Sequence, residues 1–153
     1  MPRVQREAGV TWEGNVARGN GAISAASGAF ENLPYSLATR VEKPDGKTSP
    51  EELLAAAHAA CFAMSLAGEL SSGSHPPEHL DVRATVTLDQ VEDGSHRIVA
   101  SELFARARVK EIDEAALQQV AAVANKGCTF SALIEASGKV TVNATLEGGT
   151  DGE

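Results

Sequence analysis

The most apolar segment of the chain, residues 49–70, is the one around which we expect the fold to be organised. Its apolar positions run nearly all the way round a helical wheel, which is typical of a helix buried on most sides. Ser49 can cap this helix, Pro50 suits its first position, and Glu52 completes a capping box. Gly68 is the first residue within it that disfavours a helix. The pattern therefore predicts one long central helix.

Before this helix, the pattern of apolar and polar positions predicts three strands. Residues 11–19 form the first strand, Gly19-Asn20-Gly21 makes a hairpin turn, and residues 22–27 pair back. Residues 35–42 alternate with period two and predict a third strand, with Arg40 on its polar face. These segments indicate a small antiparallel sheet.

After the central helix, the pattern predicts two long strands, a second helix, a short helical turn and a final strand. In chain order these are residues 80–91, 96–109, 114–126, 131–136 and 139–146. We expect a bulge at residues 101–103, where the alternation changes phase. Strands interrupted by two helices indicate an α+β fold, with antiparallel sheets packed around the buried central helix. Because one sheet cannot cover a helix that is apolar on all sides, we expect an intimate homodimer.

Length and charge narrow the class of protein. A chain of 153 residues has the size of one domain, which we place at residues 1–147, followed by a flexible acidic tail at residues 148–153. The net charge of −8 argues against nucleic acid and anionic membrane surfaces as partners. We expect no bilayer-spanning segment, which needs about 20 apolar residues, and no signal peptide. These features predict a cytoplasmic protein whose thiols stay reduced.

His58 and Cys61 are the two chemically active groups inside the central helix, three residues apart. Such a pair could serve nucleophilic catalysis, although core packing is the more common role of a histidine or a cysteine in a helix of this kind. Cys61 lies about three turns into the helix, beyond the reach of the helix dipole, and burial raises a thiol pKa. A reactive Cys61 would therefore need a cation from elsewhere. Arg40 is a candidate, and Glu51 could hold its guanidinium through a bidentate bond.

Cys128 is the second thiol, beside the glycine that ends the second predicted helix. Cys61 and Cys128 could form a reversible disulfide or be two independent core thiols. Ten helical residues separate Glu51 from Cys61, a rise of roughly 15 Å. A site that uses both residues would therefore take Cys61 from one chain and the Arg40–Glu51 pair from the other.

Several motifs resemble those of the OsmC/Ohr family of thiol peroxidases. The signature resemblance is Ser49-Pro50-Glu51-Glu52-Leu53 followed by Ala56-Ala57-His58-Ala59-Ala60-Cys61-Phe62. Trp12-Glu13-Gly14 and Thr39-Arg40-Val41-Glu42 resemble the OsmC branch, and Lys126-Gly127-Cys128 matches the second-cysteine motif. The family often has proline directly after this cysteine, where this chain has Thr129.

The resemblance implies an intertwined homodimer of α+β subunits with its active sites between the chains. It implies that Cys61 is the peroxidatic thiol, that Cys128 is the resolving thiol, and that Arg40 and Glu51 are the activating pair. It implies no metal, haem or flavin. The expected function is reduction of organic hydroperoxides, and of hydrogen peroxide, with an external thiol as reductant, in defence against oxidative stress.

The apolar character of the central helix hints at organic peroxides. The residues concerned are Leu53, Leu54, Phe62 and Met64. Two other functions stay open on the residues alone. One is a redox-neutral acyl hydrolase that uses Cys61 and His58, and the other is a non-catalytic binding or structural dimer whose thiols belong to the core.

Overall fold

The computed structural model describes residues 3–148, and the chain divides into two compact units between Leu53 and Leu54. The predicted acidic tail lies outside the described residues, apart from Gly148. The placement of one domain at residues 1–147 stays a prediction.

The first unit contains a three-stranded antiparallel sheet. Its strands are β1 (Ala8–Glu13), β2 (Asn20–Ala25) and β3 (Leu33–Tyr35), in that order across the sheet. The predicted first hairpin is present, but its turn lies at residues 14–19, ahead of the expected position. Gly14 has a positive φ of 86°, and the Gly19 amide donates to the Asn15 carbonyl at 2.6 Å. The turn therefore closes before Asn20, which already belongs to β2.

The predicted strand at residues 35–42 is wrong beyond Tyr35, because the chain there forms the short helix α1 (Leu37–Val41). A capping box starts this helix. The Thr39 amide donates to the Ser36 hydroxyl at 3.2 Å, and the Ser36 amide donates to the Thr39 hydroxyl at 3.0 Å. These local bonds outweigh an alternation of weakly apolar residues. Arg40 therefore lies in the last turn of a helix.

The central helix α2 (Pro50–Ser72) begins where the sequence predicts. The Glu52 amide donates to the Ser49 hydroxyl at 3.1 Å. The Glu52 carboxylate accepts a bond from the Thr48 hydroxyl at 2.7 Å instead of completing the capping box. The helix continues through Gly68, since a single glycine costs only about 1 kcal/mol in a helix that packing stabilises.

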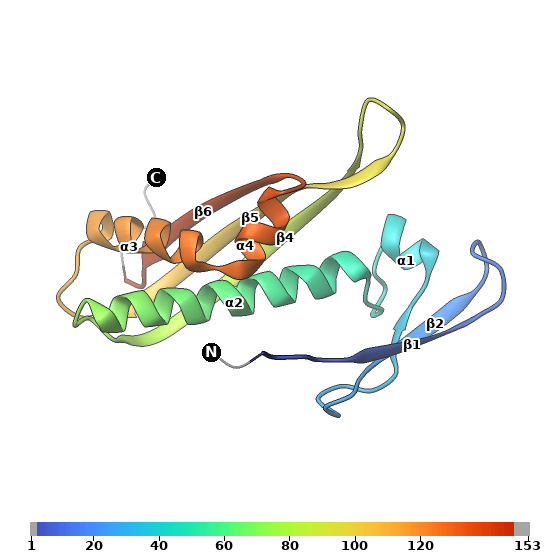
Figure 1. The fold of residues 1–153 in the computed structure, drawn as a ribbon, viewed down its shortest axis with the longest axis horizontal. Helices are drawn as coiled ribbons and strands as arrows, with labels where there is room; N and C mark the ends of the chain where they lie inside the picture. The colour runs from blue at the N-terminus through green and yellow to red at the C-terminus, as the bar shows by residue number, and fades with distance from the viewer. Residues whose placement is uncertain (1–2, 149–153) are drawn as a thin grey trace. The chain divides into compact units, whose positions relative to one another are not determined.

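The second unit is built on a three-stranded sheet with helices over one of its faces (Figure 1). Its strands are β4 (Pro77–Gln90), β5 (His96–Val109) and β6 (Lys139–Leu146), and its further helices are α3 (Glu114–Gly127) and α4 (Thr129–Glu135). These elements agree closely with the predicted segments. β4 and β5 pair antiparallel, whereas β5 and β6 pair parallel, contrary to the expected antiparallel arrangement. The two helices between β5 and β6 provide the crossover that a parallel pair requires.

The predicted bulge in β5 exists, but it lies slightly earlier. Leu88 pairs with Ile98 and Thr87 pairs with Ala100, so that Val99 is the extra residue. The alternation changes phase only after the bulge, which explains why the sequence pattern placed it at residues 101–103.

One stripe of α2 enters the core of the second unit. Its buried residues recur every four positions: His58, Phe62, Leu66 and Leu70. The hydrophobic cluster that Phe62, Leu66 and Leu70 join contains side chains from β5, α3 and β6. The remaining faces of α2 are less buried within one chain, and Met64 is 71% exposed. The expected burial on all sides is therefore not reached within a single chain.

By length and composition alone, α2 is apolar enough to cross a bilayer, whereas we had expected no apolar segment of that length. The packing of its buried stripe against β5 and α3 is that of a core helix in a soluble domain.

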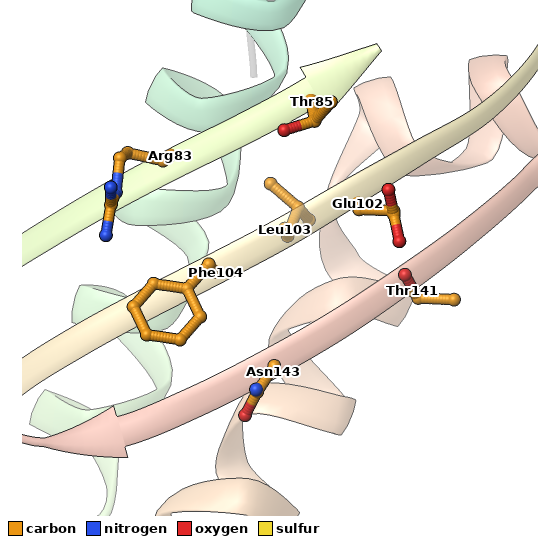
Figure 2. A pocket seen from close by; sticks show the side chains of 7 residues that line it. All are labelled: Arg83, Thr85, Glu102, Leu103, Phe104, Thr141 and Asn143. Atoms are coloured by element: carbon orange, nitrogen blue, oxygen red, sulfur yellow. The ribbon is translucent and has the colours of Figure 1, made fainter. Parts of the chain in front are cut away.

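The opposite face of the β4–β5–β6 sheet is polar (Figure 2). Two rows of side chains cross the three strands. One row is Arg83, Phe104 and Asn143, and the other is Thr85, Glu102 and Thr141. The Arg83 guanidinium lies 5.3 Å from the centre of the Phe104 ring, within range of a cation–π interaction. One face of this sheet thus packs into the core, and the other carries mainly polar side chains.

We predict that Leu66→Ala lowers the free energy of unfolding by about 2–5 kcal/mol, because Leu66 is fully buried and its removal leaves a cavity. Leu133→Ala is the matched control, since Leu133 is 63% exposed. Urea denaturation followed by circular dichroism measures both. Equal destabilisation by the two substitutions would contradict the assignment of this core.

Candidate active site

The structure brings the two thiols together. The Cys61 sulfur lies on α2, and the Cys128 thiol donates to it across 3.2 Å. Both cysteines are free, and Cys128 is 1% exposed. A disulfide needs about 2.05 Å between the sulfurs, so the pair is reduced and lies close to bonding distance.

Cys128 owes its position to the junction of two helices. It is the C-terminal cap of α3 and the N-terminal cap of α4, with extended backbone angles. Its amide donates to the Asn125 carbonyl at 3.2 Å, which closes the last turn of α3. The end of α3 at Gly127, close to the predicted end of this helix, therefore places the second thiol at the junction of α3 and α4.

The pKa of the Cys61 thiol lies below its ordinary value. Burial is the largest single influence and raises the pKa, but several hydrogen bonds together outweigh it. The donors are the Phe130 amide, the Cys128 thiol, and the hydroxyl and amide of Thr129. The Thr129 hydroxyl lies 3.7 Å from the Cys61 sulfur. These groups favour the thiolate, because each donates toward the sulfur.

This arrangement corrects our premise that a reactive Cys61 depends on a cation from elsewhere. Donors within its own unit already lower the thiol pKa. The sequence drew attention to Thr129 only as a departure from the usual proline. Proline would offer neither an amide hydrogen nor a hydroxyl at this position, so the departure adds two donors. This part of the site was missed, because no local pattern in the sequence indicates that Thr129 contacts Cys61.

Arg40 and Glu51 form the bidentate pair that we expected as a possibility. The Arg40 Nε lies 2.9 Å and 3.1 Å from the two carboxylate oxygens of Glu51, and Nη2 lies 2.6 Å from Oε1. The Glu51 hydrogen bonds, followed by its charge, raise the pKa of Arg40 against the effect of burial. Nη1 is the guanidinium nitrogen that these bonds do not engage. The pair belongs to the first unit, and the two thiols belong to the second.

A small pocket of about 220 Å³ adjoins Arg40 in the first unit. Its walls are mainly apolar and aromatic: Trp12, Val16, Tyr35, Leu37 and Pro50. The sequence did not identify these residues as lining a site. They lie on separate elements, and only the fold gathers them around the guanidinium.

His58 is fully buried and bonded at both ring nitrogens. Nδ1 lies 2.7 Å from the Ser101 hydroxyl on β5, and Nε2 lies 2.9 Å from the Ser131 hydroxyl on α4. Burial lowers the pKa of His58, partly opposed by the negative charge of Glu135. Because both nitrogens are engaged by serines, His58 is not the base of a Cys61 nucleophile in this structure. Our alternative of an acyl hydrolase therefore finds no support in the geometry.

Within residues 3–148, no three histidine, cysteine, aspartate or glutamate side chains gather in a group that could hold a metal ion. The chemistry that this site can perform is that of a low-pKa thiol beside a second thiol, in which the first sulfur is oxidised and the second closes a disulfide.

The chain is similar to known proteins along most of its length. The family described as "OsmC-like protein" matches residues 43–143. Peroxiredoxin OsmC of Escherichia coli (strain K12) is 37% identical over 136 residues, which cover 89% of this chain and 92% of that protein. OhrB, the organic hydroperoxide resistance protein of Bacillus subtilis, is 25% identical with a TM-score of 0.68, over 92% of this chain and 98% of that one.

A further solved structure has the same fold. An organic hydroperoxide resistance protein from Elizabethkingia anophelis has a TM-score of 0.72 at 24% identity, over 95% of this chain and 98% of that one. The α+β, OsmC-like fold class that the sequence predicted is thereby confirmed.

We predict that Thr129→Val raises the pKa of Cys61, because it removes a hydroxyl donor but keeps the amide and nearly the same volume. Thr129→Pro, which removes both donors, should raise it further. Since only the thiolate alkylates, the curve of iodoacetamide rate against pH should move to higher pH, first for valine and then further for proline. Thr141→Val, on the outer sheet face, is the control. Curves that coincide would exclude Thr129 as a donor to the thiolate.

Proposed function

We propose, since this chain belongs to the OsmC-like protein family, that it is a thiol-dependent peroxidase acting in hydroperoxide defence. The observation that carries this proposal is the pair of reduced sulfurs 3.2 Å apart, one of which has a lowered pKa. Peroxidatic thiols need thiolate character, and resolving thiols need close reach.

Cys61 is the peroxidatic residue in this proposal. Its thiolate attacks one oxygen of the peroxide, so that an S–O bond forms as the O–O bond breaks. The leaving oxygen takes a proton and departs as an alcohol or as water, and Cys61 becomes a sulfenic acid. Cys128 then attacks the sulfenic sulfur, and a disulfide forms with loss of water. Two equivalents of an external thiol restore both cysteines.

Arg40 and Glu51 are proposed to bind and orient the peroxide. Glu51 fixes the guanidinium plane through Nε and Nη2, which leaves Nη1 to donate to a peroxide oxygen. Fixing a donor before the substrate arrives lowers the entropic cost of reaching the reactive geometry.

The apolar pocket beside Arg40 supports organic hydroperoxides as the preferred class of substrate. Trp12 and Tyr35 offer aromatic surface for a hydrocarbon group, and their ring centres lie 5.5 Å apart. Phe62, which we had expected among the residues that hint at organic substrates, is fully buried in the core and cannot line a pocket. The preference for organic hydroperoxides is therefore supported by this pocket and not by the central helix.

A homodimer with its active sites between chains completes the proposal. Glu51 and Cys61 both belong to α2, ten residues apart, which corresponds to a rise of roughly 15 Å. The Arg40–Glu51 pair of one chain would therefore serve Cys61 of the second chain. The incompletely buried apolar faces of α2, including Met64, support an interface along this helix.

A cytoplasmic location is also part of the proposal, because two thiols that depend on an external thiol reductant suit a reducing compartment.

We predict that Cys61→Ser abolishes peroxide consumption and that Cys128→Ser keeps the first oxidation but forms no intramolecular disulfide. Each serine variant removes one sulfur nucleophile with little change in volume. Stopped-flow consumption of cumene hydroperoxide and of hydrogen peroxide, followed by intact mass spectrometry, measures both effects. Full turnover by Cys61→Ser would overturn the peroxidatic assignment, and unchanged disulfide formation by Cys128→Ser would overturn the resolving one.

We further predict that inactive chains restore one another's activity when mixed. If the site is shared, a dimer of an Arg40→Ala chain and a Cys61→Ser chain holds one intact site and one doubly defective site. Random reassociation then recovers about a quarter of wild-type activity, because half of the dimers are mixed and each has one working site.

The matched control carries both substitutions on one chain, mixed with an equal amount of wild-type chain. A shared site makes each such mixed dimer inactive, whereas a site within one chain leaves it half active. No recovery in the first mixture, together with half-active mixed dimers in the second, would show that Arg40 and Cys61 act within the same chain.

A further inference from the structure

His58 is a buried titratable group that the proposed reaction does not use. Its side chain is fully buried from solvent, and each of its ring nitrogens forms a hydrogen bond with a serine hydroxyl, at 2.7 Å and 2.9 Å. Ser101 and Ser131 are likewise fully buried. Burying three polar side chains costs stability unless their hydrogen bonds are complete, so a network of this kind has to be held in one arrangement.

The network lies one helical turn from the thiols. His58 precedes Cys61 by three residues on α2, and Cys128 precedes Ser131 by three residues at the start of α4. Side chains three apart on a helix are neighbours. The two segments are therefore joined by two successive contacts, Cys61 with Cys128 and His58 with Ser131. The Ser101 bond fixes the other side of the imidazole ring to β5.

No side-chain capping bond holds the first turn of α4. Cys128, its N-terminal cap, makes no side-chain capping hydrogen bond. The amides of Thr129 and Phe130, which a cap would usually engage, donate to the Cys61 sulfur instead. When Cys61 is the thiolate that the proposed reaction requires, the charge on its sulfur strengthens these bonds and helps to hold α4 in place.

We propose that His58 is a positioning residue for disulfide closure, which keeps Cys128 within reach of Cys61 through Ser131 after the Cys61 sulfur has lost its charge. The proposal rests on the proposed function for its place in turnover. On oxidation the sulfur becomes a neutral acceptor, and its bonds to the Thr129 and Phe130 amides weaken. The His58–Ser131 bond does not involve the sulfur and persists.

The step that His58 serves is balanced within the protein. The Cys128 sulfur forms a bond to the Cys61 sulfur, the S–O bond of the sulfenic acid breaks, and hydroxide leaves with the Cys128 proton as water. The two sulfurs have to approach from 3.2 Å to about 2.05 Å. A displacement of about 1 Å at a reacting atom can cost on the order of 100-fold in rate, so the anchor of α4 bears directly on this step.

The test follows closure without any peroxide. Ellman's reagent, an aromatic disulfide, exchanges with Cys61 and releases one coloured thiolate. Attack by Cys128 on the resulting mixed disulfide then releases a second, and stopped-flow absorbance gives the two rates separately. If the wild-type protein consumes no peroxide, the proposed function fails, but the second release still tests the role of His58.

In this assay, Ser131→Ala should leave the first release within about twofold of wild type and slow the second by about tenfold or more. Ser71→Ala is the matched control, since the Ser71 hydroxyl bonds only within its own helix, to the Ala67 carbonyl. Both releases should be unchanged in this control. A second release at the wild-type rate in folded Ser131→Ala protein, or equal slowing of both releases, overturns the proposal.

Two conservative variants of His58 separate positioning from general stability. The amide of glutamine in His58→Gln reaches the place of Nε2 and can keep the Ser131 bond, whereas the shorter asparagine in His58→Asn reaches the place of Nδ1 and keeps the Ser101 bond. We expect rapid closure with glutamine and slow closure with asparagine at similar thermal stability. The reverse order, or equal rates, contradicts the proposal even if Ser131→Ala fails to fold.

Under excess hydroperoxide, the variants that close slowly should give a different product from those that close rapidly. Slow closure leaves the sulfenic acid exposed to a second oxidation, so Ser131→Ala and His58→Asn should accumulate Cys61 sulfinic acid, which intact mass spectrometry detects as two added oxygen atoms. His58→Gln and Ser71→Ala should yield the disulfide, as the wild type does. Sulfinic acid in equal amounts across all variants would count against the positioning role.

Discussion

The approach of the α3–α4 junction to the middle of α2 is the constraint on which the site depends. Cys61 lies where burial alone would raise its pKa. The junction supplies donors that reverse this effect, and it also supplies the second thiol at 3.2 Å. One contact between distant segments therefore both lowers the pKa of the Cys61 sulfur and places the second sulfur beside it. The core packs α2 against β5 and α3, and this packing holds the contact in place.

Much of the second unit could be predicted from the sequence, because its elements are long and regular. β5 and β6 have the predicted bounds, and α3 differs by one residue. The parallel pairing of β6 could not be predicted, because strand direction depends on the path of the intervening helices. The failure at α1 has a different cause. Residues 35–42 alternate as a strand would, but the two hydrogen bonds between Ser36 and Thr39 stabilise the start of a helix instead.

In the candidate site, the thiols and the ion pair could be picked out from the sequence, and their supporting groups could not. Cys61, Cys128, Arg40 and Glu51 stood out by residue type and motif, and the structure pairs them as two couples. Ser101 and Ser131 carry no such signal, because a buried serine that bonds a histidine looks in sequence like any other serine. Their role emerges only from contacts that span 43 and 73 residues. Polar groups inside a core are therefore the part of an active site that sequence patterns describe least well.

The electrostatics of the two couples suggest a division of labour. A guanidinium held by a carboxylate at 2.6–3.1 Å forms a nearly neutral pair, whose field at a distance is weaker than that of a free cation. Such a pair is a poor source of a large pKa shift on a thiol but a good source of a fixed, directional hydrogen-bond donor. The thiol of this chain already has four donating groups from residues 128–130. We therefore infer that the hydrogen bonds at the α3–α4 junction favour the thiolate, and that the task left to Arg40 is to orient the peroxide for attack.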